Sequence, residues 1–463
     1  MAYSVRKVCV SKQRYPKLFA YLDECARKEK LLANAALFRL RNNYTAYGKD
    51  PDKLQPNEKL VQEEIVKAVA SGMQKPLRVL SYMQLEKVMR TTRNPDFFSG
   101  LPSQTAQHCL KRQCQNFNAW LEALKAYKKN PSAFTGKPKM PGYIKADTAS
   151  MIFTNQACHI RNGLIRFPKT KEKLSFGSIP ADAKLKEVQV SPEYGSFTVF
   201  GIFEIPDADA DASDLPYRAA IDFGVDNFAS IAADTDTKCL ICKGGALKAE
   251  NQWFNKRMAE AKACCMKGRD PKTYHCPQTH LMKSLCRHRK NFFNDYFHKL
   301  SKRIVSWCLK NRIGTLVLGH NDGWKQDADM GRRNNQNFVQ LPYATFIRML
   351  QYQCERTGIR CILQEESYTS KASAADRDAV PVYKQGASVS HHFSGKRVRR
   401  GLYRTADGLY VNADLNGAAN ILRKAFPDAF DGKDIYNILR EVETIRFSDL
   451  YKCKRLIPAT AAP

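Results

Sequence analysis

Residues 219–225 read Ala-Ala-Ile-Asp-Phe-Gly-Val, an apolar run that is interrupted by one carboxylate, Asp222. A carboxylate buried alone costs several kcal/mol, so an acid in the middle of a strand should be paired or bound to a metal. The alternative, a turn carboxylate that faces water, suits Asp226 better, because the turn sequence Val225-Asp-Asn227 follows the apolar run. The stretch therefore predicts a strand that carries a functional acid.

The sequence around Asp222 predicts an ordered series of strands and helices. Strands are expected at 219–225, 228–233, 238–242, 315–318 and 359–363, and helices at 248–266, 278–311 and 342–356. Three antiparallel strands followed by parallel strands that helices separate are typical of an RNase H-like α/β domain.

A second acid occupies a comparable position near the end of the chain. Residues 410–421 read Tyr-Val-Asn-Ala-Asp-Leu-Asn-Gly-Ala-Ala-Asn-Ile, which predicts a short strand that passes directly into a helix near Asn416. Taken alone, Asp414 is explained equally well as a helix N-cap. The presence of Asp222 in a comparable position favours a catalytic role for Asp414 over the N-cap role.

The two motifs together resemble the RuvC-like nuclease domain of the TnpB family, the transposon-encoded RNA-guided nucleases related to compact type V CRISPR effectors. Other segments that resemble the family follow in the family's order, at 321–326, 334–342, 365–371 and 395–401. The loop 136–143, Gly-Lys-Pro-Lys-Met-Pro-Gly-Tyr, also resembles the segment ahead of the family's barrel.

The resemblance implies an RNA-guided DNA endonuclease. Such a protein would bind one guide RNA, recognise a short duplex motif beside its target and cleave double-stranded DNA by two-metal phosphodiester hydrolysis. The expected cofactor is Mg²⁺, as two ions with Mn²⁺ as a substitute, and no protein partner is indicated.

One departure from the family concerns its third carboxylate, a Glu just after the fourth strand of the domain. Here the strand 315–318 continues into Gly319 and His320. Either the nuclease is inactive, or another acid enters the site from a neighbouring strand. We favour the second explanation, because Glu365 and Glu366 end the next strand and a glycine opposite leaves room for a longer side chain.

The two glutamates differ in their match to the family pattern, Asp-Pro, one residue and Tyr-Thr-Ser. Glu365 falls on the ordinary acidic position and Glu366 replaces the proline, so Glu366 is the additional acid and our first choice, with Glu365 second. The predicted catalytic residues are therefore Asp222, Glu366, Asp414 and Glu365, and Asp222, Glu366 and Asp414 are the predicted metal ligands. Three carboxylates supply the hard oxygen ligands that two Mg²⁺ ions need.

A second departure concerns zinc. Family members often place two Cys-x-x-Cys pairs between the last two catalytic motifs, but residues 371–412 contain no cysteine. Adjacent His391 and His392 point apart on most backbones, so we expect no zinc ribbon. The pair Cys239 and Cys242 has ligand spacing, yet it lies in a predicted strand, where packed thiols are the expected state.

The charge balance points to a polyanionic partner. The chain of 463 residues carries 75 Lys and Arg against 45 Asp and Glu, a net charge of +30. It offers no spanning helix or amphipathic anchor, so nucleic acid is favoured over a membrane. The 15 cysteines show no secreted framework and the N-terminus no signal peptide, so we expect a prokaryotic cytosolic, nucleoid-associated protein.

Basic residues in three settings are expected to contact phosphates. Lys137 and Lys139 lie in a Pro/Gly loop where they cannot pair within a helix; the alternative is a solvated linker. The helix 278–312 is expected to turn its aromatic residues to the core and basic residues to nucleic acid. The residues expected to track phosphates in this helix and in later segments are Arg287, Arg289, Lys290, Arg332, Arg333, Arg397, Arg399 and Arg400, with surface solubility as the alternative.

The N-terminal half predicts a small antiparallel β-barrel with a helical insertion. Residues 1–12 supply its first strand, 13–128 read as helices that form a recognition domain, and 129–206 supply the remaining strands. Residues 207–216 read as an acidic linker, and 217–463 as the RuvC-like domain, with a loop insertion at about 372–410 that lacks a zinc ribbon.

Two other functions remain open. The chain could be an RNA-guided DNA-binding protein whose nuclease is inactive because of Gly319, or a transposase or recombinase that needs no guide. Guide-dependent binding without metal-dependent cleavage is expected of the first, and cleavage of DNA ends without a guide of the second.

Overall fold

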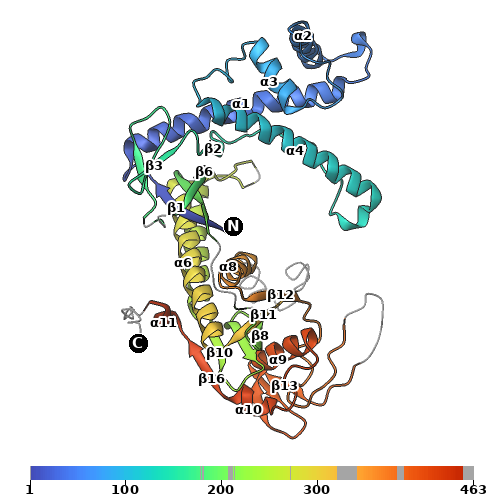
Figure 1. The fold of residues 1–463 in the computed structure, drawn as a ribbon, viewed down its shortest axis with the longest axis vertical. Helices are drawn as coiled ribbons and strands as arrows, with labels where there is room; N and C mark the ends of the chain where they lie inside the picture. Colours follow the sequence, from blue (N-terminus) through green and yellow to red (C-terminus); the bar gives the residue numbers. More distant parts are fainter. Residues whose placement is uncertain are drawn as a thin grey trace. The chain divides into compact units, whose positions relative to one another are not determined.

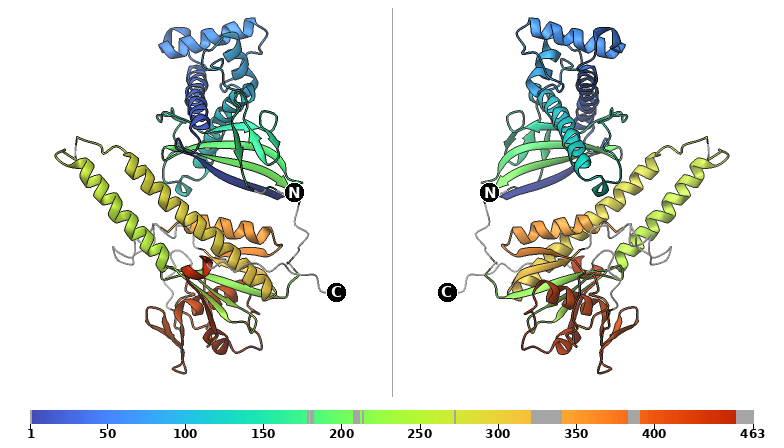
Figure 2. Two further views of the ribbon diagram at one scale, coloured as in Figure 1. Left: turned by 90° about the vertical axis from the view of Figure 1, so that its left-hand side faces the viewer. Right: turned by 90° about the vertical axis from the view of Figure 1, so that its right-hand side faces the viewer.

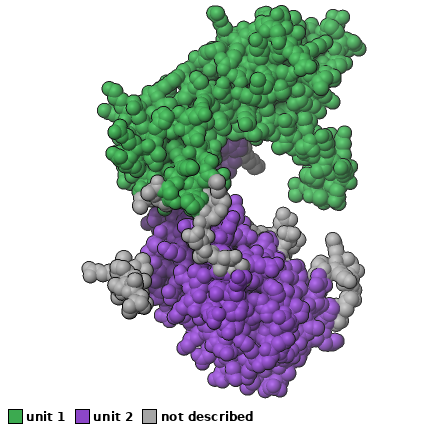
Figure 3. Space-filling model, in the orientation of Figure 1, with its two compact units in different colours: residues 1–206 green, residues 207–463 purple. Residues whose placement is uncertain are grey.

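A computed structural model describes residues 2–177, 179, 182–206, 212, 214–271, 273–320, 341–382 and 391–451. The chain forms two compact units, residues 1–206 and 207–463, which Figure 3 colours separately. We call them the N-terminal unit and the C-terminal unit. Most of the predicted linker, 207–211 and 213, lies outside the described residues.

An antiparallel sheet in the N-terminal unit joins the start of the unit to its end. Its strands, in spatial order, are β1 (Ala2–Val10), β7 (Ser196–Ile205), β6 (Lys184–Glu193) and β2 (Met151–Thr154). β1 pairs with β7 over its whole length, from Ala2 opposite Ile205 to Val10 opposite Phe197. A separate sheet contains β3 (His159–Arg161), β4 (Leu164–Arg166) and β5 (Lys173–Ser175).

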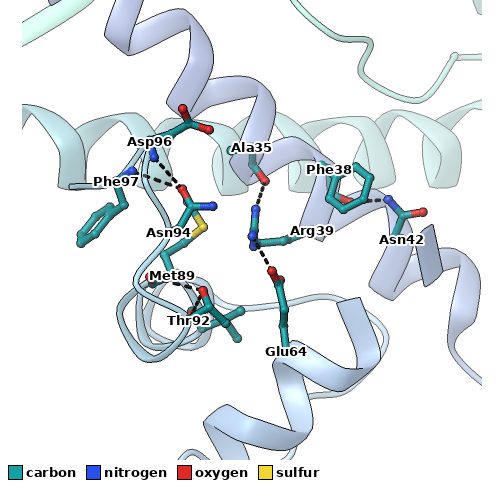
Figure 4. A network of polar contacts seen from close by, with 11 residues as sticks. Ala35, Phe38, Arg39, Asn42, Glu64, Met89, Thr92, Asn94, Asp96 and Phe97 are labelled. Carbon is teal, nitrogen blue, oxygen red and sulfur yellow. Dashed lines mark hydrogen bonds and ion pairs between the residues drawn. The ribbon is translucent and has the colours of Figure 1, made fainter. Parts of the chain in front are cut away.

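The helices of this unit lie in the chain between β1 and β2. They are α1 (Pro16–Ala46), α2 (Pro56–Ala70), α3 (Tyr82–Thr91) and α4 (Ser103–Lys129), with short 3₁₀ turns η1 (Pro51–Lys53) and η2 (Pro131–Ala133). A nearly buried ion pair ties α1 to α2, because Arg39 donates to Oε1 of Glu64 at 2.6 Å and to the carbonyl of Ala35 at 2.9 Å (Figure 4).

The C-terminal unit is built around a mixed sheet. Its strands, in spatial order, are β12 (Arg360–Gln364), β11 (Ile313–Gly319), β8 (Tyr217–Phe223), β9 (Asn227–Ala233), β10 (Cys239–Lys243) and β16 (Val442–Ile445). β8, β9 and β10 are antiparallel neighbours, whereas β11 and β12 run parallel to β8. This confirms the predicted series of antiparallel and then parallel strands; β16, which pairs with β10, was not predicted.

Helices cover both faces of this sheet. α6 (His280–Lys310) and α8 (Tyr343–Glu355) pack on the face that carries Ala219 and Ile221. α9 (Ala413–Ala425) and α10 (Ile435–Arg440) pack on the face that carries Ala220 (Figure 1). Side chains alternate along a strand, so Asp222 faces α9.

The remaining elements extend from the sheet. α5 (Gly245–Met266) packs along α6, and Figure 2 shows the two as a long helical pair. β13 (Lys396–Arg399), β14 (Leu402–Arg404) and β15 (Tyr410–Asn412) form a small antiparallel sheet ahead of α9, and α11 (Phe447–Tyr451) follows β16. In the described part of the chain, no helix has the length and apolar character needed to cross a bilayer.

Candidate active site

Asp222 is the second-to-last residue of β8, and its side chain faces the N-terminal half of α9. Gly417 of α9 makes room for it, because a β-carbon on Gly417 would lie 2.6 Å from Oδ2 of Asp222. Any larger residue at this position would displace the carboxylate. The helix and the strand are therefore fitted around this acid.

Asp414 lies in the first turn of the same helix, but it does not cap it. The N-cap is Asn412, whose side-chain oxygen accepts from the backbone N–H groups of Asp414 and Leu415 at 2.9 and 3.1 Å. The N-cap explanation of Asp414 is therefore wrong. Its Oδ2 accepts from Asn227 at 2.7 Å, and its Oδ1 forms an ion pair with Arg397 at 3.3 Å.

Glu366 follows β12 and reaches the end of β11. A β-carbon on Gly319, the last residue of β11, would lie 2.6 Å from Oε2 of Glu366. β11 pairs with β8 so that Leu318 is opposite Ile221, the residue before Asp222. The carboxylate of Glu366 thus lies in the space that a side chain at Gly319 would fill.

Glu365 points to a different partner. Its Oε2 accepts from Nζ of Lys424 at 2.5 Å, and its Oε1 accepts from the backbone N–H of Ser367 at 2.6 Å. Burial raises the pKa of Glu365, but the hydrogen bonds from Lys424 and Ser367 outweigh it and leave the pKa below its ordinary value. Glu365 is therefore held as the carboxylate of an ion pair.

The pKa shifts show that the acids influence one another. Burial raises the pKa of Asp222 well above its ordinary value, and the charges of Glu366 and Asp414 raise it further, while Arg397 opposes them. Burial and the charge of Glu365 raise the pKa of Glu366 to about 7 against the opposing Lys424. Asp222, Glu366 and Asp414 thus form a cluster of interacting carboxylates.

The cluster can be compared with a metal site. Within the described ranges, no group of three His, Cys, Asp or Glu side chains is arranged to hold a metal ion. The chemistry of the donors nevertheless fits a hard divalent cation, which takes carboxylate oxygens and relieves their repulsion. Asp222, Glu366 and Asp414 supply donors of this kind, although their side chains are not grouped as a three-residue metal site in the described structure.

Two of the arginines that were predicted to bind phosphates form ion pairs with aspartates in the structure. Arg397 pairs with Asp414, as described above, and Arg400 pairs with Asp226 at 2.9 Å. Asp226 also pairs with Lys248 of α5 at 2.5 Å, and it is an exposed carboxylate in the turn between β8 and β9, as the sequence suggested. Arg399 is exposed on β13.

The other predicted basic residues are spread over both units. Lys137 and Lys139 are exposed on a loop whose backbone is anchored by Trp120, which donates to the carbonyl of Pro138 at 3.2 Å. Arg289 donates to Asn251 at 2.8 Å and lies over the ring of Phe293, so it packs beside the aromatic residues and not on the opposite face. Its neighbours Arg287 and Lys290 are half-buried, and Arg332 and Arg333 lie outside the described residues.

Cys239 and Cys242 are packed thiols in β10, as expected. Burial raises the pKa of each to about 12, and Sγ of Cys239 donates to the carbonyl of Ile438 at 3.4 Å. The two side chains are therefore buried as neutral thiols in the sheet. His391 packs its ring against Tyr368 at 4.9 Å.

Two aspartates organise the segment where the family often carries zinc. Oδ2 of Asp378 accepts from the backbone N–H of Ser373 at 2.8 Å and of Ser394 at 3.1 Å. Oδ2 of Asp376 accepts from Oγ of Ser373 at 2.5 Å and from the backbone N–H of Ala406 at 2.9 Å. These bonds join the described ends of the insertion at 372–410, of which 383–390 lie outside the described residues.

The residues that support the acids were not predicted from the sequence. Asn227 holds Asp414, and Lys424 holds Glu365. Asn416 and Asn420 hold the backbone that follows Glu366. Asn416, Asn420 and Lys424 recur every four residues in a helix whose other residues are mostly apolar, and this spacing was the available signal.

Two family profiles match the C-terminal unit. OrfB_IS605, a probable transposase, matches residues 210–325, and the Cas12f1-like TNB domain matches residues 343–421. The TnpB-like protein ORF457 of Acidianus two-tailed virus is 24% identical over 215 residues, which cover 45% of this chain and 41% of that protein. The chain thus spans less than half the length of this relative.

Solved structures match the chain more loosely. The Cas12f1–sgRNA–target DNA complex matches with a TM-score of 0.48 and 13% identity over 89% of this chain and 84% of that one. Alicyclobacillus acidoterrestris C2c1 with single-guide RNA matches with a TM-score of 0.41 and 8% identity over 91% and 88%. Neither TM-score establishes a shared fold. The family profiles and the viral relative nevertheless agree on one relationship, and by its sequence the C-terminal unit of this chain is TnpB-like.

Proposed function

We propose that this chain is an RNA-guided DNA endonuclease with a rearranged RuvC-like active site. The observation that carries the proposal is the carboxylate of Glu366 in the space beside Gly319. It adds a third acid to Asp222, near the carboxyl end of β8, and to Asp414, in the first turn of α9. Glu366 follows the carboxyl end of β12, and α/β sheets commonly bind ligands at the carboxyl ends of their parallel strands. An inactive descendant would have no use for a carboxylate at this position.

Asp222, Glu366 and Asp414 would hold Mg²⁺, with Mn²⁺ as a substitute. When bound, two such ions would supply an activated water and stabilise the leaving 3′ oxygen. The chain's own residues keep the acids in place: Gly319 and Gly417 leave them room, and Asn227 donates to Asp414. Arg397 balances part of their charge before DNA is bound.

The two units would divide the work of binding. In the C-terminal unit, the antiparallel and parallel strands fit a RuvC-like domain. In the N-terminal unit, α1–α4 would be a recognition domain inserted in a small β-barrel, which the pairing of β1 with β7 supports. The guide would supply sequence specificity by base pairing while the protein holds the backbones.

The proposed partners are a guide RNA and target double-stranded DNA. The net charge of +30 suits several strands of nucleic acid, and Lys137 and Lys139 project from an anchored loop without a nearby acid in their segment. Two solved structures that match the chain loosely are a Cas12f1 complex with sgRNA and target DNA and a mini-RNA-guided endonuclease. These partners are described for those proteins.

The experiment is to purify the protein with its RNA, sequence that RNA, and test cleavage of a matching duplex in Mg²⁺. Asp222→Ala and Asp414→Ala should abolish cleavage and leave guided binding nearly intact, because each removes one carboxylate of the cluster. Full-rate cutting by either variant would contradict the assignment. A binding loss as large as the cleavage loss would indicate a structural role.

A second candidate is an RNA-guided DNA-binding protein without nuclease activity. The observations in its favour are Gly319, where the family has an acid, and the ion pair that engages Asp414 with Arg397. Guided binding without cutting in either Mg²⁺ or Mn²⁺ would establish it. Cutting of DNA ends by RNA-free protein would instead indicate a guide-independent transposase.

A further inference from the structure

A ridge of polar side chains runs along α9 on the side of the segment that follows Glu366. Its members are Asn416, Asn420 and Lys424, which are spaced by four residues and therefore share one face of the helix. Asn416 and Asn420 are fully buried, and the side chain of Lys424 is 4% exposed. Buried polar groups of this kind are costly unless their hydrogen bonds are made.

Apart from the bond that Asn420 accepts from Arg423, the side-chain bonds of the ridge within the described residues go to one stretch of chain. Asn416 accepts from the N–H of Ala374 at 2.9 Å and donates to the carbonyl of Ala372 at 2.8 Å. Asn420 donates to the carbonyls of Thr369 and Ala372 at 2.9 and 2.7 Å.

Lys424 extends the ridge toward the glutamates. Besides Glu365 it donates to the carbonyls of Ser367 and Pro381, both at 3.0 Å. Every ridge residue therefore binds the stretch 365–381.

The segment needs such support because no regular structure holds it. Residues 367–374 lie in turns beyond the end of β12, without a strand partner. The hydroxyl of Thr369 donates to the carbonyl of Glu366 at 2.8 Å, and the carbonyl of Thr369 is held by Asn420. A short chain of bonds thus runs from α9 through Thr369 to the backbone of Glu366.

We propose that Asn420, with Asn416 and Lys424, is a positioning residue that fixes Glu366 in the active site. The inference rests on the proposed function. Because α9 also carries Asp414 in its first turn, the helix that holds the segment of Glu366 bears a second acid of the cluster. An acid moved from a regular strand to a turn requires a support of this kind, which a Glu on β11 would receive from the sheet.

The test uses Asn420→Asp, which keeps the shape and the oxygen that accepts from Arg423 but removes the two donors to Thr369 and Ala372. Asn420→Ala is a second variant. The matched control is Asn311→Ala in the same unit, which removes a donor to the carbonyl of Trp307. Asn311 lies two residues before the first residue of β11, at the end of that strand opposite to Gly319. Thermal stability, guided DNA binding, cleavage rate and amide exchange over 366–374 are measured for the full chain with its RNA.

For Asn420→Asp we expect exchange over 366–374 to rise about tenfold or more and cleavage to fall about tenfold or more. Guided binding should change by less than about twofold, and the Mg²⁺ concentration for half-maximal cleavage should rise. Asn311→Ala should leave exchange over 366–374 and cleavage unchanged even where it lowers thermal stability.

Wild-type cleavage by Asn420→Asp would overturn the inference, whether or not exchange rises. So would a loss of cleavage in Asn311→Ala of the same size, because the effect would then follow stability alone. If the wild-type protein binds its guided target without cutting, the proposed function fails. Amide exchange over 366–374 in Asn420→Asp then tests by itself whether the ridge holds this segment. Faster exchange confined to 366–374 would support the ridge, and unchanged exchange would overturn it.

Discussion

Oε2 of Glu366 lies where a side chain of Gly319 would begin, 2.6 Å from the position of a β-carbon on that glycine. The relationship joins the ends of two paired strands, because Gly319 is opposite Gln364 in the register of β11 and β12. A glycine at this position is thus a requirement for the carboxylate, and the two residues act as one feature.

Gly319→Ala is expected to displace the carboxylate of Glu366. The new β-carbon would also lie 2.8 Å from Cδ1 of Ile421, so the substitution should lower the free energy of unfolding by about 1–3 kcal/mol. We also expect most of the cleavage activity to be lost. Gly245→Ala is the control, since a β-carbon there meets no atom within 4 Å. Cleavage at the wild-type rate by Gly319→Ala would show that the contact has no functional consequence.

Glu365→Gln is expected to affect stability more than cleavage. The amide keeps an acceptor for Lys424 but leaves this buried ammonium without a counter-charge, at a cost of about 1–3 kcal/mol. Chemical denaturation and cleavage assays separate the two effects. A loss of cleavage greater than that of Glu366→Gln, at unchanged stability, would reverse the roles of the two glutamates.

The strands and the acids were predictable because their signals are local. The apolar run around Asp222 identified the strand that carries this acid, and the missing side chain at Gly319 directed attention to Glu365 and Glu366. The choice between Glu365 and Glu366 depended on their match to the family pattern. In the structure they differ physically, since Lys424 engages Glu365 and leaves Glu366 to the space beside Gly319.

The supporting contacts were not predictable because they join residues far apart in sequence. Asn227 meets Asp414 across 187 positions, and Asn420 meets Thr369 across 51. The N-cap alternative for Asp414 failed because Asn412, two residues earlier, caps the helix instead. Arg397 was predicted to contact a phosphate backbone. The sequence around it does not reveal that β13 places Arg397 beside Asp414.

The insertion after Lys371 should be stable without zinc. Asp378→Ala removes the acceptor of Ser373 and Ser394 and is expected to increase proteolysis within 391–406, whereas Asp407→Ala, an exposed neighbour, should not. Elemental analysis should find less than stoichiometric zinc, and a zinc chelator should leave thermal stability unchanged. One tightly held zinc per chain would refute this account and direct attention to Cys239 and Cys242.

The N-terminal unit should lose stability as pH rises toward neutrality. Burial raises the pKa of Glu29 from 4.5 to about 7 despite its ion pair with Arg112. Because the folded-state pKa is the higher one, the contribution is complete below about pH 4.5 and is lost as pH rises to about 7, up to ~3 kcal/mol.

Hydrogen exchange of α1 and α4 measures this change. The loss between about pH 5 and pH 8 should be smaller in Glu29→Gln, and it should persist in Glu122→Gln, whose side chain is exposed. Equal pH dependence in wild type and Glu29→Gln would contradict the assignment to Glu29.

The central claim, a nuclease whose third acid has moved to Glu366, is tested most directly by the cleavage rate of a guide-matched duplex in Mg²⁺. Wild-type and Glu366→Gln complexes are compared after both are shown to bind guide and target equally. The substitution keeps the shape and removes the charge, so the rate should fall about 100-fold or more, which corresponds to ~2.7 kcal/mol of barrier. Equal rates for the two complexes would contradict the claim.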